Sequence, residues 1–164
     1  MTQSHSAPQE RAGGEDMIYG ILQERLSKVL ELTNALGDEI SSESLNLRNA
    51  NGRSNTIGQQ FWCLVGARES YARAFEHGGW RGFSCSLTAQ GVHEPDAVRK
   101  ALADSRDLVQ SKLDSLPEAG TDDARVNVLF DLEQHEVQHH GQLIRYFFAN
   151  ALPFPKAFAA RYNL

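Results

Sequence analysis

The sequence has few cysteines, no long apolar run and no cluster of basic residues, and each absence excludes a class of protein. Two cysteines among 164 residues do not form a disulfide scaffold. The longest apolar run, residues 61–67, has seven residues including Gly66, whereas a membrane span needs ~18–20. The 16 Lys and Arg residues against 21 Asp and Glu residues give a net charge of −5 without a basic stripe. These features argue against membrane insertion and against nucleic acid as a partner.

The beginning of the chain also lacks the apolar segment of an export signal. Residues 2–16 are polar, so no signal peptide is predicted and the cytoplasm is the expected location. Both cysteines, Cys63 and Cys85, are then expected to be reduced. Residues 1–15 are expected to be a flexible leader, and residues 16–164 one domain, which is long enough to bury a core.

Apolar residues spaced three, four and seven positions apart predict an all-α fold with four helices and no strand. The polar connection of residues 37–54 is long enough to cross one end of a four-helix bundle. The Gly-rich loop of residues 78–94 carries Trp80 and Phe83, which predicts that it packs against the bundle, for example over one end. The expected helices are residues 16–36, 54–77 (with Ser54 or Asn55 as the cap), 95–116 and 121–150.

The strongest chemical signal is a pair of histidines in the fourth expected helix. His135 and His139 are four residues apart, which places both imidazoles on one helix face, one turn apart. Two such nitrogens can bind one transition metal, and a third ligand must come from another part of the chain. On a helical wheel His139 lies at the edge of the apolar arc and His135 just outside it. A metal bound there would face a cleft rather than the core.

Three other polar residues of this helix lie close to the pair. His140 falls inside the apolar arc near Glu133 and Glu136, which predicts a buried polar network. Residues 135–139 also match the H-E-x-x-H pattern of zinc proteases, in which the Glu is the general base. That interpretation fails for want of a third ligand, because no His, Asp, Glu or Cys follows His140.

Further candidates lie in the second expected helix and in the loop after it. Cys63 lies at the edge of the apolar stripe, where a free cysteine can be a ligand or simply a small buried side chain. Arg68 and Glu69 are expected to form a local or interhelical ion pair of little energy. The loop segment of residues 80–85 is a lid or a packed connection without chemistry, and Cys85 has no neighbouring base.

Two segments resemble the DinB/YfiT-like family. HEVQHHGQLIRY, residues 135–146, is similar to the family's last-helix motif, in which two histidines four apart precede a basic residue and Gly-Gln. TIGQQFWCLVGARESY, residues 56–71, resembles its second-helix segment, which carries the third metal histidine. The resemblance covers residues 16–150 and places His135 and His139 on two metal ligands. Cys63 stands where the family has its third histidine.

The resemblance implies a four-helix bundle with a long crossover, a homodimer, and a divalent metal, zinc or nickel in most members. It implies that Cys63, His135 and His139 hold the metal and that Glu136, Glu133 or His140 supports the site. It also implies a small-molecule substrate, in some relatives a low-molecular-weight thiol, and transferase or hydrolase chemistry. Because a thiolate is a competent ligand for soft metals, a Cys/His/His site is chemically reasonable.

Three functions compete at this point. The first is a metal-dependent thiol transferase or hydrolase built on Cys63, His135 and His139. The second is a non-catalytic stress or interaction bundle whose metal site has degenerated at Cys63. The third, a zinc protease, lacks its downstream ligand.

Overall fold

Helices are the only regular secondary structure in residues 9–49, 53–116 and 123–164, the parts of the chain that this computed structural model describes. Side chains are described from Met17 onward. The prediction of an all-α protein is therefore confirmed for these residues. The long helices are α1 (Gln9–Asp38), α3 (Ile57–His77), α4 (Pro95–Asp114) and α5 (Asp123–Ala149), and the short ones are α2 (Ser42–Leu45), the 3-10 helix η1 (Gly91–His93) and α6 (Lys156–Tyr162).

Helix α3 begins one or two residues later than predicted, because Thr56 rather than Ser54 or Asn55 caps it. The Thr56 side chain accepts a hydrogen bond from the backbone N–H of Gln59, and the Gln59 side chain accepts one from the N–H of Thr56. This reciprocal pair satisfies two backbone donors that a helix start leaves free. At the other end Gly78 takes a left-handed conformation with φ of 67°, so the predicted stop is confirmed.

The other long helices differ from the prediction mainly at their ends. Helix α1 begins at Gln9, so residues 9–15 are helical rather than part of a flexible leader, and residues 1–8 lie outside the described chain. Helix α4 begins at Pro95 as predicted, and α5 lies within the predicted range. The predicted start of the last helix at residue 121 lies outside the described residues. The sequence did not predict α2, η1 or α6.

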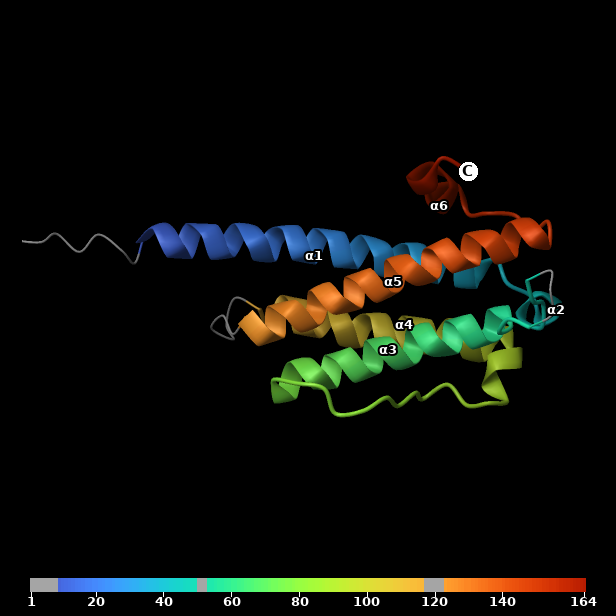
Figure 1. Cartoon of the computed structure of the whole chain (residues 1–164), viewed down its shortest axis with the longest axis horizontal. Coiled ribbons are helices and arrows are strands. Elements are labelled where there is room, and N and C mark those ends of the chain that lie inside the picture. Colours follow the sequence, from blue (N-terminus) through green and yellow to red (C-terminus); the bar gives the residue numbers. More distant parts are fainter. Residues whose placement is uncertain (1–8, 50–52, 117–122) are drawn as a thin grey trace, which may run out of the picture.

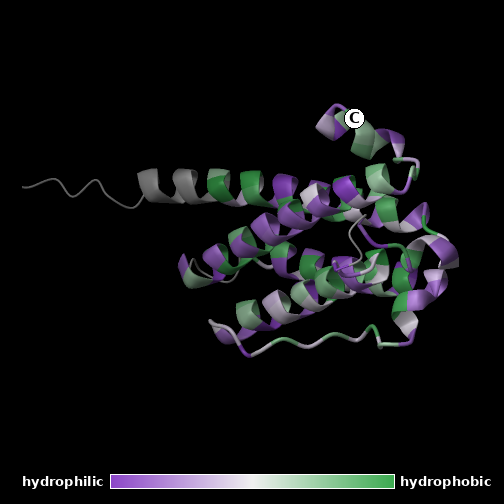
Figure 2. Ribbon diagram, turned by 45° about the vertical axis from the view of Figure 1, so that its right-hand side comes forward, coloured by the Kyte–Doolittle hydropathy of each residue, from purple (hydrophilic) through white to green (hydrophobic). Residues whose placement is uncertain are grey.

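The four long helices lie side by side, with α1 and α3 on opposite sides of the group (Figure 1). Helix α1 packs against α4 and α5, and α3 packs against the same two helices. Hydrophobic and hydrophilic residues alternate along the helices, as expected where each helix buries one face (Figure 2). Within the described residues, no helix is both long enough and apolar enough to cross a bilayer.

Residues 79–90 form an extended segment, here called the strap, that runs alongside α3 (Figure 1). The suggestion that this loop packs over one end of the helices is therefore wrong. Gly66 explains the close fit, since a Cβ atom there would lie 2.2 Å from the Phe83 ring. The polar contacts that fasten the strap come from α3 as well, so the strap and α3 form one face of the molecule.

The C-terminal helix α6 packs against α1 near the end of α5 (Figure 1). Phe158 is fully buried in the main hydrophobic cluster, together with Leu36, Phe61 and Phe147. A buried aromatic side chain of this size contributes about 3 kcal/mol. The buried Phe158 side chain holds α6 in place, so that Tyr162 lies next to α5.

Candidate metal centre

Cys63, His135 and His139 converge between α3 and α5. One potential ligand atom from each residue lies within 4.8 Å of the other two. The Cys63 Sγ atom is 3.7 Å from Nε2 of His135, and the two imidazole centroids are 4.6 Å apart. The three side chains that the sequence predicts as ligands are thus brought together from two helices by the fold.

The separation of Cys63 from His135 suits two ligands of one tetrahedral transition-metal ion. A sulfur and a nitrogen bound at ~2.3 and ~2.1 Å to one ion with a tetrahedral angle are about 3.6 Å apart. The observed distance of 3.7 Å between the Cys63 and His135 atoms matches that value. A Cys/His/His set would leave the fourth position open, as catalytic zinc sites do. The residues present therefore could hold a metal ion, although the distances do not choose which one.

The helical pattern explains why the three ligands meet at a rim. Cys63 and His135 are half-buried and His139 is buried at 7% exposure, so the cluster spans the border between core and solvent. His139 follows His135 by one turn and lies closer to the apolar arc of α5. The predicted location at the edge of the buried face is confirmed by these exposures.

A chain of hydrogen bonds fixes the tautomer of His139. The Tyr146 hydroxyl donates to the backbone carbonyl of Asn55 at 2.8 Å, so its oxygen is free to accept. Gln60 donates its amide nitrogen to that oxygen at 3.4 Å and turns its carbonyl oxygen toward Nδ1 of His139, 2.7 Å away. Nδ1 must therefore carry the proton, which leaves the Nε2 lone pair of His139 for a metal.

Burial gives both histidines the protonation state that metals bind. It lowers the pKa of His139 to about 4, with a further contribution from the neighbouring His135. Burial lowers the pKa of His135 as well. Both imidazoles are therefore neutral at pH 7. Burial raises the pKa of the Cys63 thiol, so a metal must displace a proton from that ligand.

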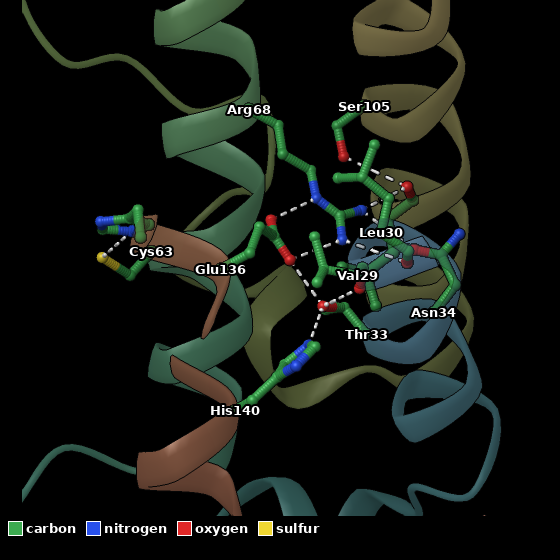
Figure 3. A network of polar contacts seen from close by, with 11 residues as sticks. Val29, Leu30, Thr33, Asn34, Cys63, Arg68, Ser105, Glu136 and His140 are labelled. Carbon is green, nitrogen blue, oxygen red and sulfur yellow. Dashed lines mark hydrogen bonds and ion pairs between the residues drawn. The ribbon is translucent and has the colours of Figure 1, made fainter. Parts of the chain in front are cut away.

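The residues predicted to support the site, Glu133, Glu136 and His140, make their described hydrogen bonds elsewhere. Glu133 pairs with Arg25 at 2.8 Å on the α1 side of α5. Glu136 and His140 are fully buried in a network between the helices, and Cys63 lies apart from it (Figure 3). The predicted buried network thus exists, but without Glu133, and Gln60 orients His139 in place of a glutamate. A catalytic role for the three residues stays a prediction.

Arg68 lies at the centre of that network and contacts the three other long helices (Figure 3). Its side chain is fully buried and its Nε lies 2.7 Å from Glu136 of α5. It also donates to Asn34 of α1 and to the carbonyl of Leu102 in α4. Of the two predicted pairings, the local one with Glu69 does not form, because Glu69 accepts from Ser86 in the strap. Arg68 makes an interhelical pair instead, with Glu136, and this pair is buried rather than solvated.

The network has a defined direction of donation. The Thr33 hydroxyl donates to Oε2 of Glu136 at 2.6 Å, closer than the backbone carbonyl that it also approaches at 3.1 Å. His140 must then donate from Nε2 to the Thr33 oxygen at 2.7 Å and accept from the Tyr162 hydroxyl at Nδ1, 2.6 Å away. Every polar atom of the neutral His140 ring is satisfied.

Opposing effects set the pKa values of the buried groups in this network. Burial alone would raise the pKa of Glu136, but the charge of Arg68 and the hydrogen bonds from Arg68 and Thr33 hold it below its ordinary value. Burial lowers the pKa of His140 to about 4, and the carboxylate of Glu136 only partly opposes this. Glu136 is thus ionised and His140 neutral in the folded protein at pH 7.

Comparison of the chain with family models, with curated proteins and with solved structures gave no match. The candidate site therefore depends on the geometry of the chain itself.

Several residues that shape the site were not singled out from the sequence. For Arg68, which was predicted to form an ion pair, the burial was missed. It could have been found, because Arg68 lies four residues after Leu64 and seven after Phe61, both fully buried on the same face of α3. Tyr162 carries no such signal, since its contact with His140 depends on where α6 docks. The same holds for the bond from Gln60 to His139, which crosses from one helix to another.

Proposed function

We propose that the protein is a metal-dependent enzyme acting on a small molecule, with the metal held by Cys63, His135 and His139. The observation that carries this proposal is the convergence of three ligand atoms within 4.8 Å from two helices. Bound there, a divalent metal would supply Lewis acidity toward water or a thiol. The reaction is thiol transfer or hydrolysis, and the substrate is a small molecule such as a low-molecular-weight thiol.

The donor set supports zinc or nickel as the metal. Thiolate and imidazole ligands favour softer first-row ions over magnesium, calcium or manganese, which prefer oxygen. Gln60 supplies the outer hydrogen bond that metal-binding histidines ordinarily have. The partly buried position keeps the ligands fixed while leaving one side toward solvent.

The arrangement of the helices supports assignment to the DinB/YfiT-like family. Helices α1 and α3 lie on opposite sides of the group, so the connection between them crosses from one side to the other, as a four-helix bundle with a long crossover requires. The metal residues come from α3 and α5, in agreement with the two motifs of the resemblance. A homodimer, which the family implies, forms part of the same proposal.

Metal analysis of protein purified without a His-tag tests the proposal. We expect about one equivalent of zinc or nickel in the wild-type protein and loss of metal in Cys63→Ser and His139→Ala. Cys85→Ser and His93→Ala are matched controls, because neither residue belongs to the ligand cluster, and both should retain metal. A metal-to-protein ratio near zero after anaerobic purification, even with added zinc, would contradict the proposal.

The second candidate is a non-catalytic bundle that has lost its metal. The Sγ–Nε2 distance of 3.7 Å also fits a thiol hydrogen bond between Cys63 and His135, which needs no ion. This candidate predicts that His135→Ala and His139→Ala leave fold and partners intact and change stability little. A wild-type protein that binds no metal at any pH would favour it.

A further inference from the structure

Large aromatic side chains are exposed on the face of the molecule that holds the metal centre. Trp62 is 37% exposed, Phe83 44% and Trp80 54%. Trp62 adjoins Cys63 in α3, and the other two belong to the strap. Apolar side chains of this size gathered on one face of a protein indicate a surface that binds something.

One group of these rings connects the strap with the metal centre. The Trp80 ring packs edge-on against Tyr71 with centroids 5.3 Å apart, and Tyr71 lies 6.4 Å from the ring of His135. His135 in turn lies 4.6 Å from His139. A continuous row of four rings therefore runs from the strap to the ligand cluster.

A second pair of rings lies on the strap side of Cys63. Phe83 contacts Trp62 with centroids 4.8 Å apart, and its ring occupies the space above Gly66. Gly66 follows Cys63 by three residues, so the Phe83 ring lies beside the turn of α3 that carries the thiol. The ligand cluster is thus flanked by aromatic side chains from two directions.

Polar contacts with α3 hold the strap rings in position. Arg73 donates to the side chain of Ser84 and to the carbonyl of Gly82, and the N–H of Ser84 donates to Ser70 at 3.0 Å. Glu69 accepts from the N–H of Ser86 at 2.8 Å. These contacts fasten the strap at residues 82, 84 and 86, within the aromatic segment and just after it. A surface fixed in advance loses little side-chain freedom when it binds a ligand.

We propose that Trp80, Phe83 and Tyr71 form a binding surface for an aromatic group of the substrate, beside the metal held by Cys63, His135 and His139. This inference rests on the proposed function and names the substrate class: a metal-binding head group joined to a flat aromatic ring. Aromatic rings stack on exposed aromatic side chains in offset or edge-on geometry, and Trp80 and Phe83 are 54% and 44% exposed.

The test compares two small probes that share one metal-binding group. Protein loaded with cobalt(II) is titrated with benzohydroxamate and with acetohydroxamate, and binding is followed by the visible absorption of the cobalt. The ratio of the two dissociation constants isolates the contribution of the phenyl ring. In Trp80→Ala and Phe83→Ala we expect the preference for benzohydroxamate to fall between about threefold and tenfold relative to the wild type.

Phe148→Ala is the matched control, since Phe148 is an aromatic residue at 62% exposure in α5, outside the strap and α3. Its ratio should equal that of the wild type. If both strap variants and the double variant take up cobalt but keep the wild-type ratio, the proposed aromatic surface is wrong. The proposed metal centre would not be affected by that result. Failure of the wild-type protein to take up cobalt would overturn the metal centre and this inference with it.

Discussion

Cys63 determines how metal binding depends on pH. Burial raises the pKa of its thiol, whereas burial lowers the pKa of His139 to about 4 and that of His135 below its ordinary value, so only the cysteine must lose a proton above pH 7. We expect the affinity for zinc to rise about tenfold per pH unit between pH 7 and 8. Competition with a chromophoric chelator at each pH measures this slope.

A Cys63→His variant provides the comparison for that slope. It would restore the three-histidine set of the resembling family, and a neutral imidazole releases no proton when it binds a metal above its pKa. The variant should therefore bind zinc with little dependence on pH between 7 and 8. A wild-type affinity that is constant over the same range would show that the Cys63 thiolate is not a ligand.

Gln60 is expected to control the affinity through the His139 ring. Its carbonyl oxygen holds the proton on Nδ1, 2.7 Å away, and a Gln60→Leu side chain of similar size cannot do so. Loss of such an outer hydrogen bond costs about 10- to 100-fold in metal affinity. Isothermal titration with zinc measures the change. Gln138→Leu, at an exposed position on α5, should bind zinc as the wild type does.

Among the elements, the ion pair between Arg68 and Glu136 joins α3 to α5 inside the core. Both side chains are fully buried at 2.7 Å, so removing one partner leaves an uncompensated charge. We expect Arg68→Met and Glu136→Gln each to lower the free energy of unfolding by about 3–5 kcal/mol. Urea denaturation measures both losses. The double variant should lose clearly less than the sum, and additive losses would contradict the coupling.

Local sequence patterns predicted the long helices because their signals act within a few residues. Pro95 at the start of α4 and Gly78 after α3 fix helix ends through backbone conformation alone. The course of the strap along α3 and the presence of α6 were not predicted, because Phe83 and Phe158 make their contacts with helices distant in sequence. The spacing of His135 and His139 in the sequence predicted that they share one helix face. Their distance from Cys63 could not be predicted in this way, because it depends on how α3 and α5 pack.

For the whole molecule, the buried histidines predict loss of stability in mild acid. His139 and His140 have pKa values lowered to about 4 by burial, against 6.5 for the free side chain. Between these two values the unfolded chain binds more protons than the folded protein, so stability falls as pH decreases from 6.5 toward 4. Each histidine contributes about 3 kcal/mol to that loss, since one pKa unit corresponds to ~1.4 kcal/mol.

A single substitution separates this effect from acid denaturation by other groups. His140→Gln removes one titrating ring at a position with no exposure, so its stability should depend less steeply on pH between 4 and 6.5, by up to one proton. The measurement is the free energy of unfolding in urea at several pH values, with a chelator present to exclude metal. His93→Gln, at an exposed position, should keep the wild-type slope. If His140→Gln also kept that slope, His140 would be charged in the folded protein, and the neutral ring that accepts from Tyr162 and donates to Thr33 would be wrong.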